Sequence, residues 1–319
     1  MKRIGVITSG GDSSGMNAAV RAVVKTALDQ GCEVYGFLRG YTGVLNGKYS
    51  IMDSRAVSGV IQRGGTILQS ARCEEFKTEA GQLKAVSNLF GLGVEGMVVI
   101  GGDGSLRGAN VLAGMGMPVI GIPASIDNDI FGTDISIGAD TALNVIVGAV
   151  DMIKDTASSH DRAFIIEVMG RNCGYLAAMS AIACGAEVAI IPEIGFDLGK
   201  IAERLYARFK EGRTNSIIMV AEGAMSAYEV ENQLKDRIGY DIRITVLGHL
   251  QRGGSPTVFD RILASRLGRS AVEALLRKES GKMVGQVKNR IVLTDLDEVV
   301  GTCKMVDLEM IELTDILGQ

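Results

Sequence analysis

The sequence has few of the residues from which metal and disulfide frameworks are built. It contains only two histidines, His160 and His249, which excludes a histidine-rich metal site. Its five cysteines are scattered and lack metal-ligand spacing, so we expect reduced thiols and a cytoplasmic protein. Four prolines stand against 42 glycines, which predicts many tight strand–helix turns and few rigid linkers.

Long apolar runs and an excess of positive charge are also missing. No run approaches the roughly 20 apolar residues that a bilayer-spanning helix needs. The net charge of −4 gives no general attraction to nucleic acid or to an anionic membrane. Residues 1–3 lead into a strand and a glycine loop, so we expect no signal peptide. The 319 residues, 47% hydrophobic and 22% charged, are typical of one large globular domain or two.

Strand and helix patterns alternate along the chain. A short apolar strand over residues 4–7 precedes a helix over residues 16–30, and a second strand follows over residues 33–37. This order is the unit of a parallel sheet with right-handed crossovers. Further strands are expected over residues 98–100, 119–122, 163–168, 188–191, 216–221 and 290–293, and helices over residues 81–89, 106–113, 140–156, 200–210 and 260–276. We therefore predict an α/β protein with mostly parallel sheets, without a linker that marks one domain boundary.

The most informative stretch is the apolar strand that ends at Ile100 and the segment Gly101-Gly102-Asp103-Gly104-Ser105 that follows it. Glycine lets the backbone turn sharply and approach a ligand closely, and we expect Ser105 to cap the next helix. A helix N-terminus attracts phosphate, whereas the Asp103 carboxylate requires a cation such as Mg²⁺ between itself and phosphate. The segment therefore indicates a magnesium–nucleotide site, with an ordinary strand–turn–helix corner as the alternative.

Other strand ends carry similar loops. Residues 8–15 form a polar glycine-rich loop that lacks the P-loop lysine and the dinucleotide spacing, so it is a second candidate phosphate cradle. Asp127 and Asp129 follow the next strand, just after the hydroxyl of Ser125, and one can hold a metal while the other accepts a proton. A structural turn would explain one aspartate and one asparagine. Charged groups also end later strands, at Arg162, Arg171, Glu222, His249 and Arg252.

Acids beside a metal, with basic groups around them, predict phosphoryl transfer, in which catalysis is mostly positioning and charge neutralisation. Glu222 can accept hydrogen bonds from a polyol, which favours a sugar phosphate over a protein as the acceptor.

Five motifs together resemble the bacterial ATP-dependent 6-phosphofructokinase family. They are Thr8-Ser9-Gly10-Gly11-Asp12, Gly101-Gly102-Asp103-Gly104-Ser105, Ile126-Asp127-Asn128-Asp129, Met169-Gly170-Arg171 and Gly248-His249-Leu250-Gln251-Arg252-Gly253-Gly254. The resemblance implies a homotetramer of chains with two Rossmann-like α/β domains, between which each chain crosses more than once. It assigns residues 1–138 plus 251–300 to ATP binding and residues 139–250 plus 301–319 to fructose 6-phosphate binding.

The resemblance also implies a role for each site residue. Asp127 would take the proton of the 6-hydroxyl, with Arg171 stabilising charge and Ser125 beside them, while Asp103 and Asp129 would hold Mg²⁺. The ATP residues would be Gly11, Tyr41, Arg72, Cys73, Gly102, Asp103, Gly104, Ser105 and Gly108. The sugar-phosphate residues would be Ser125, Asp127, Asp129, Met169, Gly170, Arg171, Glu222, His249 and Arg252, with Arg162 and Arg243 reaching in from a neighbouring subunit.

Several positions bear on which phosphoryl donor the protein uses and on how effectors regulate it. Relatives that use pyrophosphate commonly carry Asp at position 104 and Lys at 124, so Gly104 and Ala124 favour ATP here. In this family an effector site for ADP or phosphoenolpyruvate lies between subunits, and the matching positions are Arg21, Lys25, Arg55, Lys154, Gly185, Glu187 and Arg213. Ser54, Gly59 and Glu211 depart from the pattern, so we expect weak or altered regulation.

Three rival functions stay open at this stage. The first is a pyrophosphate-dependent phosphofructokinase. The second is a non-catalytic sugar-phosphate sensor, which would predict a broken acid cluster, whereas all three aspartates are present. The third is a periplasmic-type sugar-binding module, which would need an export signal. We expect no nucleic-acid or membrane partner.

Overall fold

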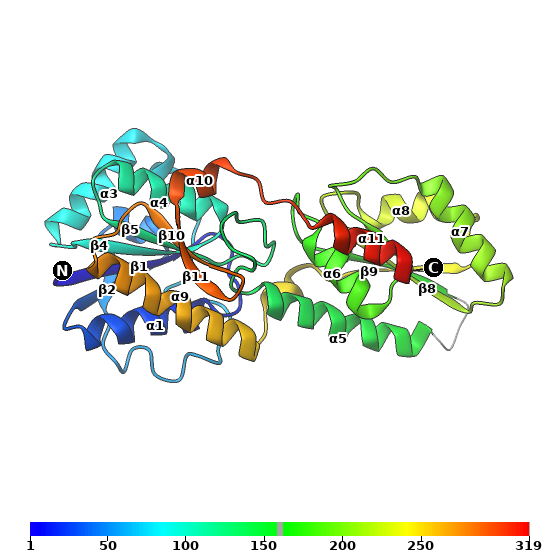
Figure 1. Ribbon diagram of the computed structural model, residues 1–319, viewed down its shortest axis with the longest axis horizontal. Helices are drawn as coiled ribbons and strands as arrows, with labels where there is room; N and C mark the ends of the chain where they lie inside the picture. The colour runs from blue at the N-terminus through cyan, green and yellow to red at the C-terminus, as the bar shows by residue number, and fades with distance from the viewer. Residues whose placement is uncertain (158–161, 319) are drawn as a thin grey trace. The chain divides into compact units, whose positions relative to one another are not determined.

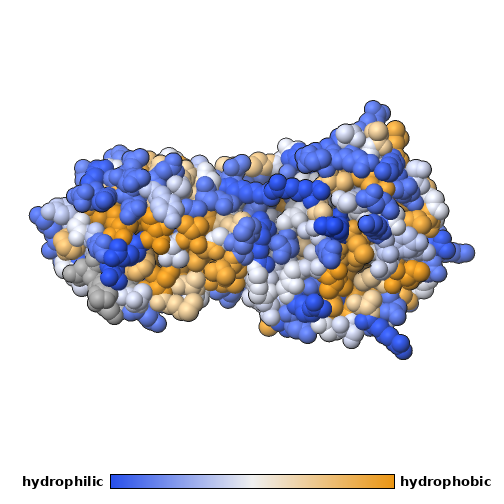
Figure 2. Space-filling view, turned by 180° about the vertical axis from the view of Figure 1, so that it is seen from behind, coloured by the Kyte–Doolittle hydropathy of each residue, from blue (hydrophilic) through white to orange (hydrophobic). Residues whose placement is uncertain are grey.

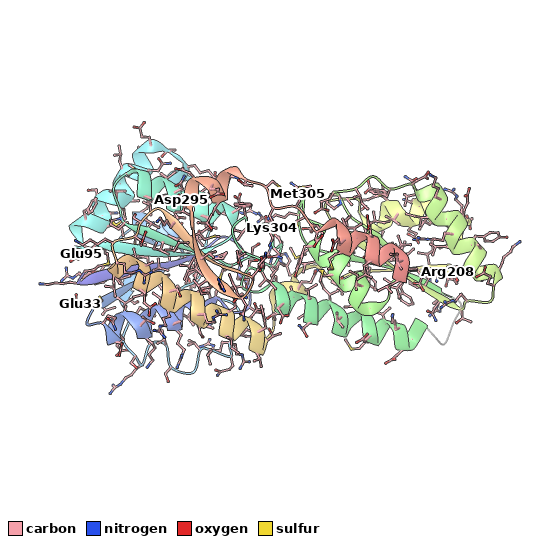
Figure 3. All side chains as sticks on the ribbon, in the orientation of Figure 1. Glu33, Glu95, Arg208, Asp295, Lys304 and Met305 are labelled. Atoms are coloured by element: carbon pink, nitrogen blue, oxygen red, sulfur yellow. The ribbon has the colours of Figure 1, made fainter. Side chains whose placement is uncertain are left out.

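The computed structural model describes residues 1–157 and 162–318, so His160 lies outside the described part. The chain divides into two compact units and crosses between them repeatedly. Unit 1 comprises Met1–Ile126, Ile130–Thr141 and Arg252–Lys304, and unit 2 comprises Asp127–Asp129, Ala142–Gln251 and Met305–Gln319. The last crossing lies between Lys304 and Met305 (Figure 3). These bounds differ from the expected domain ranges by a few residues, and they place residues 127–129, expected in the first domain, in unit 2.

Unit 1 is built on a seven-stranded sheet of order β11-β10-β5-β4-β1-β2-β3. Its strands are β1 (Arg3–Ser9), β2 (Glu33–Phe37), β3 (Tyr49–Ile51), β4 (Gly96–Gly101), β5 (Val119–Pro123), β10 (Lys282–Val287) and β11 (Arg290–Asp295). The pairs β2–β3 and β10–β11 are antiparallel, and the other neighbouring pairs are parallel. The expected α/β class with mostly parallel sheets is therefore confirmed.

Helices cover both faces of this sheet (Figure 1). They are α1 (Met16–Asp29), α2 (Tyr41–Leu45), the 3₁₀ turn η1 (Glu75–Lys77), α3 (Glu79–Gly91), α4 (Asp103–Gly114), α9 (Val258–Leu276) and α10 (Leu296–Gly301). Successive side chains of a strand point to opposite faces, so Val98 joins the apolar cluster under α1 and α9, whereas Val99 joins the cluster under α3 and α4. Both faces are apolar, which is why the strands read as continuous hydrophobic runs.

Unit 2 contains a four-stranded parallel sheet of order β7-β8-β6-β9. Its strands are β6 (Arg162–Val168), β7 (Val188–Ile190), β8 (Asn215–Ala221) and β9 (Asp241–Val246). The accompanying helices are α5 (Ala139–Ala157), α6 (Tyr175–Cys184), α7 (Leu198–Lys210), α8 (Ala227–Leu234), the 3₁₀ turn η2 (Gly248–Arg252) and α11 (Leu308–Leu317). Helix α5 starts in unit 1 and continues into unit 2.

Hydrophilic residues cover much of the face of each unit seen in Figure 2, with smaller hydrophobic patches between them. Among the described residues, no helix is both long enough and apolar enough to cross a membrane.

One local expectation was wrong, and the strands β3, β9 and β10 were not expected. Helix α4 begins at Asp103 with Gly102 as its N-cap, so Ser105 lies inside the first turn and does not cap the helix. Strand β10 was not expected, because Gly285 and Gln286 interrupt its apolar pattern.

Candidate active site

Three loops of unit 1 meet at the carboxyl edge of its sheet. In the parallel register, Ser9 at the end of β1 pairs with Gly101 at the end of β4, and Gly101 pairs with Pro123 at the end of β5. The loops that follow these strands therefore lie side by side, where open α/β sheets bind ligands. The packing here is close, since a Cβ on Gly101 would lie 2.4 Å from the carbonyl oxygen of Ser9. Glycine is required at this position by the neighbouring strand.

Asp103 and Gly104 form the open part of this edge. The side chain of Asp103 is 41% exposed, and its Oδ2 lies 3.0 Å from Nε of Arg107, one helical turn away. A Cβ built on Gly104 would meet no atom within 4 Å, so the space beside the N-terminus of α4 is open. The described part of the chain has no group of three or more histidine, cysteine or acidic side chains that could hold a metal ion by itself. A cation at Asp103 would thus take its other ligands from phosphate and water, as Mg²⁺ usually does.

Tyr41 closes one side of α4. Its hydroxyl donates to the carbonyl oxygen of Ser105 at 2.7 Å, and burial raises the pKa of Tyr41, so the phenol stays neutral. A Cβ on Gly108 would lie 2.6 Å from the Tyr41 hydroxyl, so glycine is needed there to admit the ring. Cys73 is half-buried and packs against the apolar cluster under α3 and α4, to which Tyr41 belongs. Arg72 is exposed.

The first glycine loop is joined to the segment that contains Arg252. Nη1 of Arg252 donates to the carbonyl oxygen of Asp12 at 3.0 Å, and a Cβ on Gly11 would lie 2.5 Å from the same nitrogen. The hydroxyl of Ser14 donates to the carbonyl oxygen of Gly254 at 2.8 Å. Arg252 therefore belongs to unit 1 and contacts the phosphate-type loop after β1.

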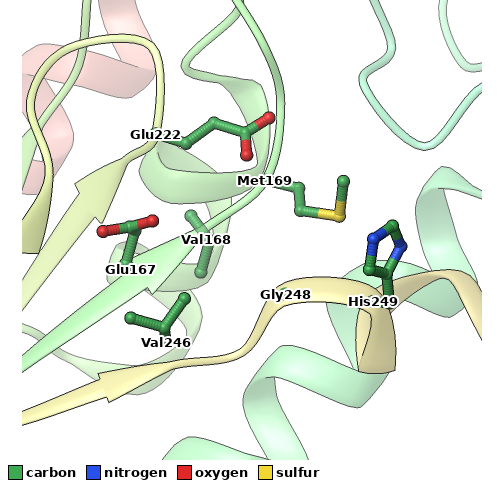
Figure 4. A pocket seen from close by; sticks show the side chains of 7 residues that line it. All are labelled: Glu167, Val168, Met169, Glu222, Val246, Gly248 and His249. Atoms are coloured by element: carbon green, nitrogen blue, oxygen red, sulfur yellow. The ribbon is translucent and has the colours of Figure 1, made fainter.

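In unit 2, three neighbouring strands end at one small cavity. Strand β6 lies between β8 and β9, with Val168 opposite Ala221 and Glu167 opposite Val246. The residues after these strands are consequently close together. They line a cavity of about 120 Å³ formed by Glu167, Val168, Met169, Glu222, Val246, Gly248 and His249 (Figure 4). The side chains of Met169 and His249 face one another across it. The structure thus brings together three predicted sugar-phosphate residues, Met169, Glu222 and His249.

The turn after β6 directs Arg171 toward Asp127. Gly170 and Arg171 both have positive φ, 139° and 51°, and the N–H of Arg171 donates to Oε1 of Glu222 at 2.9 Å. Nε of Arg171 lies 3.5 Å from Oδ2 of Asp127, and the Asp127 side chain is 4% exposed against 63% for Arg171. A buried carboxylate beside an exposed guanidinium is an arrangement suited to accepting a proton next to transferred negative charge.

The residues next to Asp127 have a distinct backbone conformation and hydrogen bonding. Asn128, between Asp127 and Asp129, has a φ of 52° and thus a left-handed backbone conformation. Asp129 is half-buried. The carbonyl oxygen of Ser125 accepts a hydrogen bond of 2.5 Å from the hydroxyl of Ser136.

Neither Arg162 nor Arg243 lines the cavity. Arg162 is the first residue of β6, so the seven-residue length of that strand, about 20 Å, separates it from Val168 at the cavity. Asp241 Oδ2 lies 3.6 Å from Nε of Arg162 and 2.6 Å from Nη2 of Arg243, so one carboxylate holds both guanidinium groups. Within one chain, these two arginines are not brought to the residues around His249.

The predicted effector residues fall into both units. Arg21, Lys25 and Arg55 belong to unit 1, whereas Lys154, Gly185, Glu187 and Arg213 belong to unit 2. The Glu187 carboxylate accepts from the N–H of Ile217 at 2.7 Å and lies 3.8 Å from Nη1 of Arg208. Arg208 was not predicted, since only its place on α7 brings it to Glu187.

Gln251 was also missed, although it stands inside the motif at residues 248–254. It is buried, and its amide joins the loops after β6 and β9. Its position within that motif was the one sequence signal that Gln251 has a role in the site.

Comparison with known proteins identifies the family. A family model described as phosphofructokinase matches residues 3–275. The chain belongs to the phosphofructokinase family. Curated proteins named ATP-dependent 6-phosphofructokinase align with this phosphofructokinase chain from end to end. The protein of Halalkalibacterium halodurans is 53% identical over 318 residues and that of Natranaerobius thermophilus 51%, each alignment covering 100% of both chains.

Solved phosphofructokinase structures share the fold. The Pichia pastoris phosphofructokinase in the T-state superposes with a TM-score of 0.90 at 40% identity, covering 94% of this chain and 35% of that one. The Saccharomyces cerevisiae phosphofructokinase gives 0.89 at 39% identity, covering 100% of this chain and 48% of that one. This phosphofructokinase therefore spans about a third to a half of those two longer chains. A pyrophosphate-dependent phosphofructokinase from Marinobacter aquaeolei gives 0.86 at 24% identity, which shows the shared fold alone.

Proposed function

We propose that this phosphofructokinase transfers the γ-phosphoryl group of ATP to the 6-hydroxyl of fructose 6-phosphate, giving fructose 1,6-bisphosphate and ADP in glycolysis. The observation that carries the proposal is the end-to-end identity of 51–53% with relatives named ATP-dependent 6-phosphofructokinase. The pairing of buried Asp127 with Arg171 gives the chain a chemical centre of the kind this reaction needs.

Asp127 is the base in this proposal. Its carboxylate takes the proton of the 6-hydroxyl as the oxygen attacks phosphorus. Arg171 offsets the negative charge on the transferred group, and Ser125 lies two residues before the base. Met169, Gly170, Glu222 and His249 orient the sugar, with Asp129 and Arg252 as further ligands of the sugar phosphate.

The N-terminus of α4 receives the triphosphate. Its open space at Gly104 and its backbone N–H groups suit phosphate, and Gly11, Gly102 and Ser105 complete the cradle. The nucleoside is assigned to the positions of Tyr41, Arg72, Cys73 and Gly108. Asp103 and Asp129 are the carboxylates proposed for Mg²⁺, which neutralises charge on the phosphates when it is bound.

ATP is favoured over pyrophosphate by two small residues. Gly104 leaves open space where an Asp side chain would carry negative charge, and Ala124 supplies no cation to a short polyphosphate. The residues proposed for ATP all belong to unit 1, whereas those proposed for fructose 6-phosphate belong to unit 2 except for Ser125 and Arg252.

The active form we propose is a cytoplasmic homotetramer. Arg162 lies at the opposite end of β6 from its own chain's cavity and Arg243 does not line that cavity, which supports their serving a neighbouring subunit. The seven effector positions are assigned to a site between subunits, with weak or altered response to ADP and phosphoenolpyruvate.

A donor-specificity assay tests the function. Purified protein is given fructose 6-phosphate and Mg²⁺ with either ATP or pyrophosphate, and fructose 1,6-bisphosphate is measured, with Asp127→Ser as the control. We expect product with ATP, little or none with pyrophosphate, and a large loss in the variant. Product from pyrophosphate alone would identify the rival enzyme, and no product from either donor would favour the non-catalytic sensor.

A further inference from the structure

We infer that Gln251 is a positioning residue that fixes the spacing between the two loops holding the sugar phosphate. The inference rests on the proposed function. It concerns a side chain that does not line the cavity, so Gln251 acts through Met169 and His249 rather than by touching substrate.

Gln251 is 1% exposed, and both ends of its amide are used. Its Oε1 accepts from the N–H of Met169 at 3.1 Å, and its Nε2 donates to the carbonyl oxygen of Gly248 at 3.0 Å. Met169 is the first residue after β6, whereas Gly248 begins the turn after β9. One buried side chain therefore links the backbones of the two loops.

The link begins where the sheet stops. The last ladder pair between β6 and β9 is Glu167 with Val246, and the N–H of Leu247 still donates to the carbonyl oxygen of Glu167 at 3.1 Å. Beyond these residues the backbones diverge to open the cavity. The amide of Gln251 spans the divergence and stands in for the missing ladder bonds, which keeps Met169 opposite His249 (Figure 4).

Loss of the amide has a predictable consequence. An apolar side chain of similar length would leave the N–H of Met169 and the C=O of Gly248 without this partner in a buried place, which favours a different loop arrangement. Binding of fructose 6-phosphate then weakens, whereas ATP binding in unit 1 does not change. A purely structural glutamine would instead lower stability and leave both Michaelis constants alone.

The test compares Gln251→Met with Gln286→Met in the full-length protein. Gln286 is a matched control, because it is a buried amide of unit 1 whose Oε1 accepts from Arg266 at 2.7 Å. Steady-state kinetics give KM for each substrate, calorimetry gives the Kd for fructose 6-phosphate, and thermal denaturation gives Tm. Gln251→Glu, which has the same shape and keeps the acceptor, replaces Gln251→Met should the latter not fold.

We expect Gln251→Met to raise KM and Kd for fructose 6-phosphate at least tenfold with KM for ATP within twofold of wild type. Gln286→Met should lower Tm and leave both KM values within twofold. An unchanged KM and Kd for fructose 6-phosphate in Gln251→Met, or an equal rise for both substrates, overturns the inference. In those cases the wild type is active and the proposed function stands; a wild type that forms no fructose 1,6-bisphosphate overturns the function and the inference with it.

Discussion

The N–H of Arg171 donates a 2.9 Å hydrogen bond to the carboxylate of Glu222, and this bond holds Arg171 in a left-handed backbone conformation. A non-glycine residue with φ of 51° carries a conformational cost that surrounding contacts must offset. The same backbone geometry brings the guanidinium to 3.5 Å from Asp127. Glu222 therefore positions the proposed catalytic pair, Asp127 and Arg171, in addition to any contact with the sugar.

Glu222→Ala should reduce kcat as well as raise KM for fructose 6-phosphate. The bond from the Arg171 N–H to a charged acceptor contributes about 1.5–3 kcal/mol, so kcat/KM should fall roughly 10- to 150-fold. Glu222→Gln keeps an acceptor oxygen and should retain most of kcat. Steady-state kinetics decide the matter, and an unchanged kcat in Glu222→Ala would mean that the glutamate only contacts sugar.

Gly104→Asp should weaken ATP binding without harming the fold. A Cβ fits at Gly104 because no atom lies within 4 Å, and an acidic residue in the first turn of a helix is tolerated. A carboxylate beside the triphosphate repels it, so KM for ATP should rise at least tenfold, by roughly 1.4 kcal/mol.

Gly114→Asp is the matched control, because Gly114 ends the same helix and also has open space around it. Its KM for ATP should stay near that of wild type. Equal KM values for ATP in the two variants would remove the N-terminus of α4 from the nucleotide site.

Much of the fold follows from local sequence signals. The apolar spacing of α1 predicted a helix over residues 16–30, and the structure ends it at Asp29. Parallel strands covered on both faces read as apolar runs, so β4 and β5 were also expected where they occur. Strand β10 was not predicted because Gln286 places a polar side chain within it. The partner of that side chain, Arg266, is 20 residues away in the sequence, and no local pattern reveals it.

The candidate site divides in the same way. Asp127, Arg171 and Glu222 were predicted because each follows a strand end. Arg171 and Glu222 follow the neighbouring strands β6 and β8 and so share one edge, whereas Asp127 follows β5 of the other sheet. Gln251 and Arg208 were missed, since their partners come from other loops and helices. Ser105 was misassigned because a serine after glycines is typical of a cap, whereas α4 starts at Asp103, three residues before the expected helix.

Asp260 should matter to stability rather than to catalysis. It is buried on α9, and its carboxylate accepts from the N–H of Gly138 at 2.9 Å, from the N–H of Thr141 at 2.8 Å and from the Thr141 hydroxyl. These bonds fix the first turn of α5. Asp260→Asn places an amide NH₂ against donors, so the free energy of unfolding should fall by about 1–3 kcal/mol.

The pH dependence of this loss has a definite sign. Burial raises the pKa of Asp260 above its ordinary 3.8 despite the hydrogen bonds, so the folded state favours the protonated carboxyl. Its contribution is fully present below pH 3.8 and is lost as pH rises through the raised pKa. Urea denaturation across pH should show the wild-type advantage over Asp260→Asn shrinking from acid toward neutral pH. Asp29→Asn, on the exposed side of α1, gives the baseline for losing one surface charge, and an advantage that grows with pH would contradict the assignment.

The central claim is that the buried carboxylate of Asp127 accepts the proton of the sugar hydroxyl while Arg171 offsets the charge. The most direct measurement pairs turnover with binding in Asp127→Asn, which keeps the size of the side chain and removes its basicity. Fructose 6-phosphate binding by calorimetry should stay within about tenfold of wild type, whereas kcat with Mg-ATP should fall 10²- to 10⁴-fold, the usual contribution of a general base. A folded Asp127→Asn protein that turns over at the wild-type rate would contradict the account.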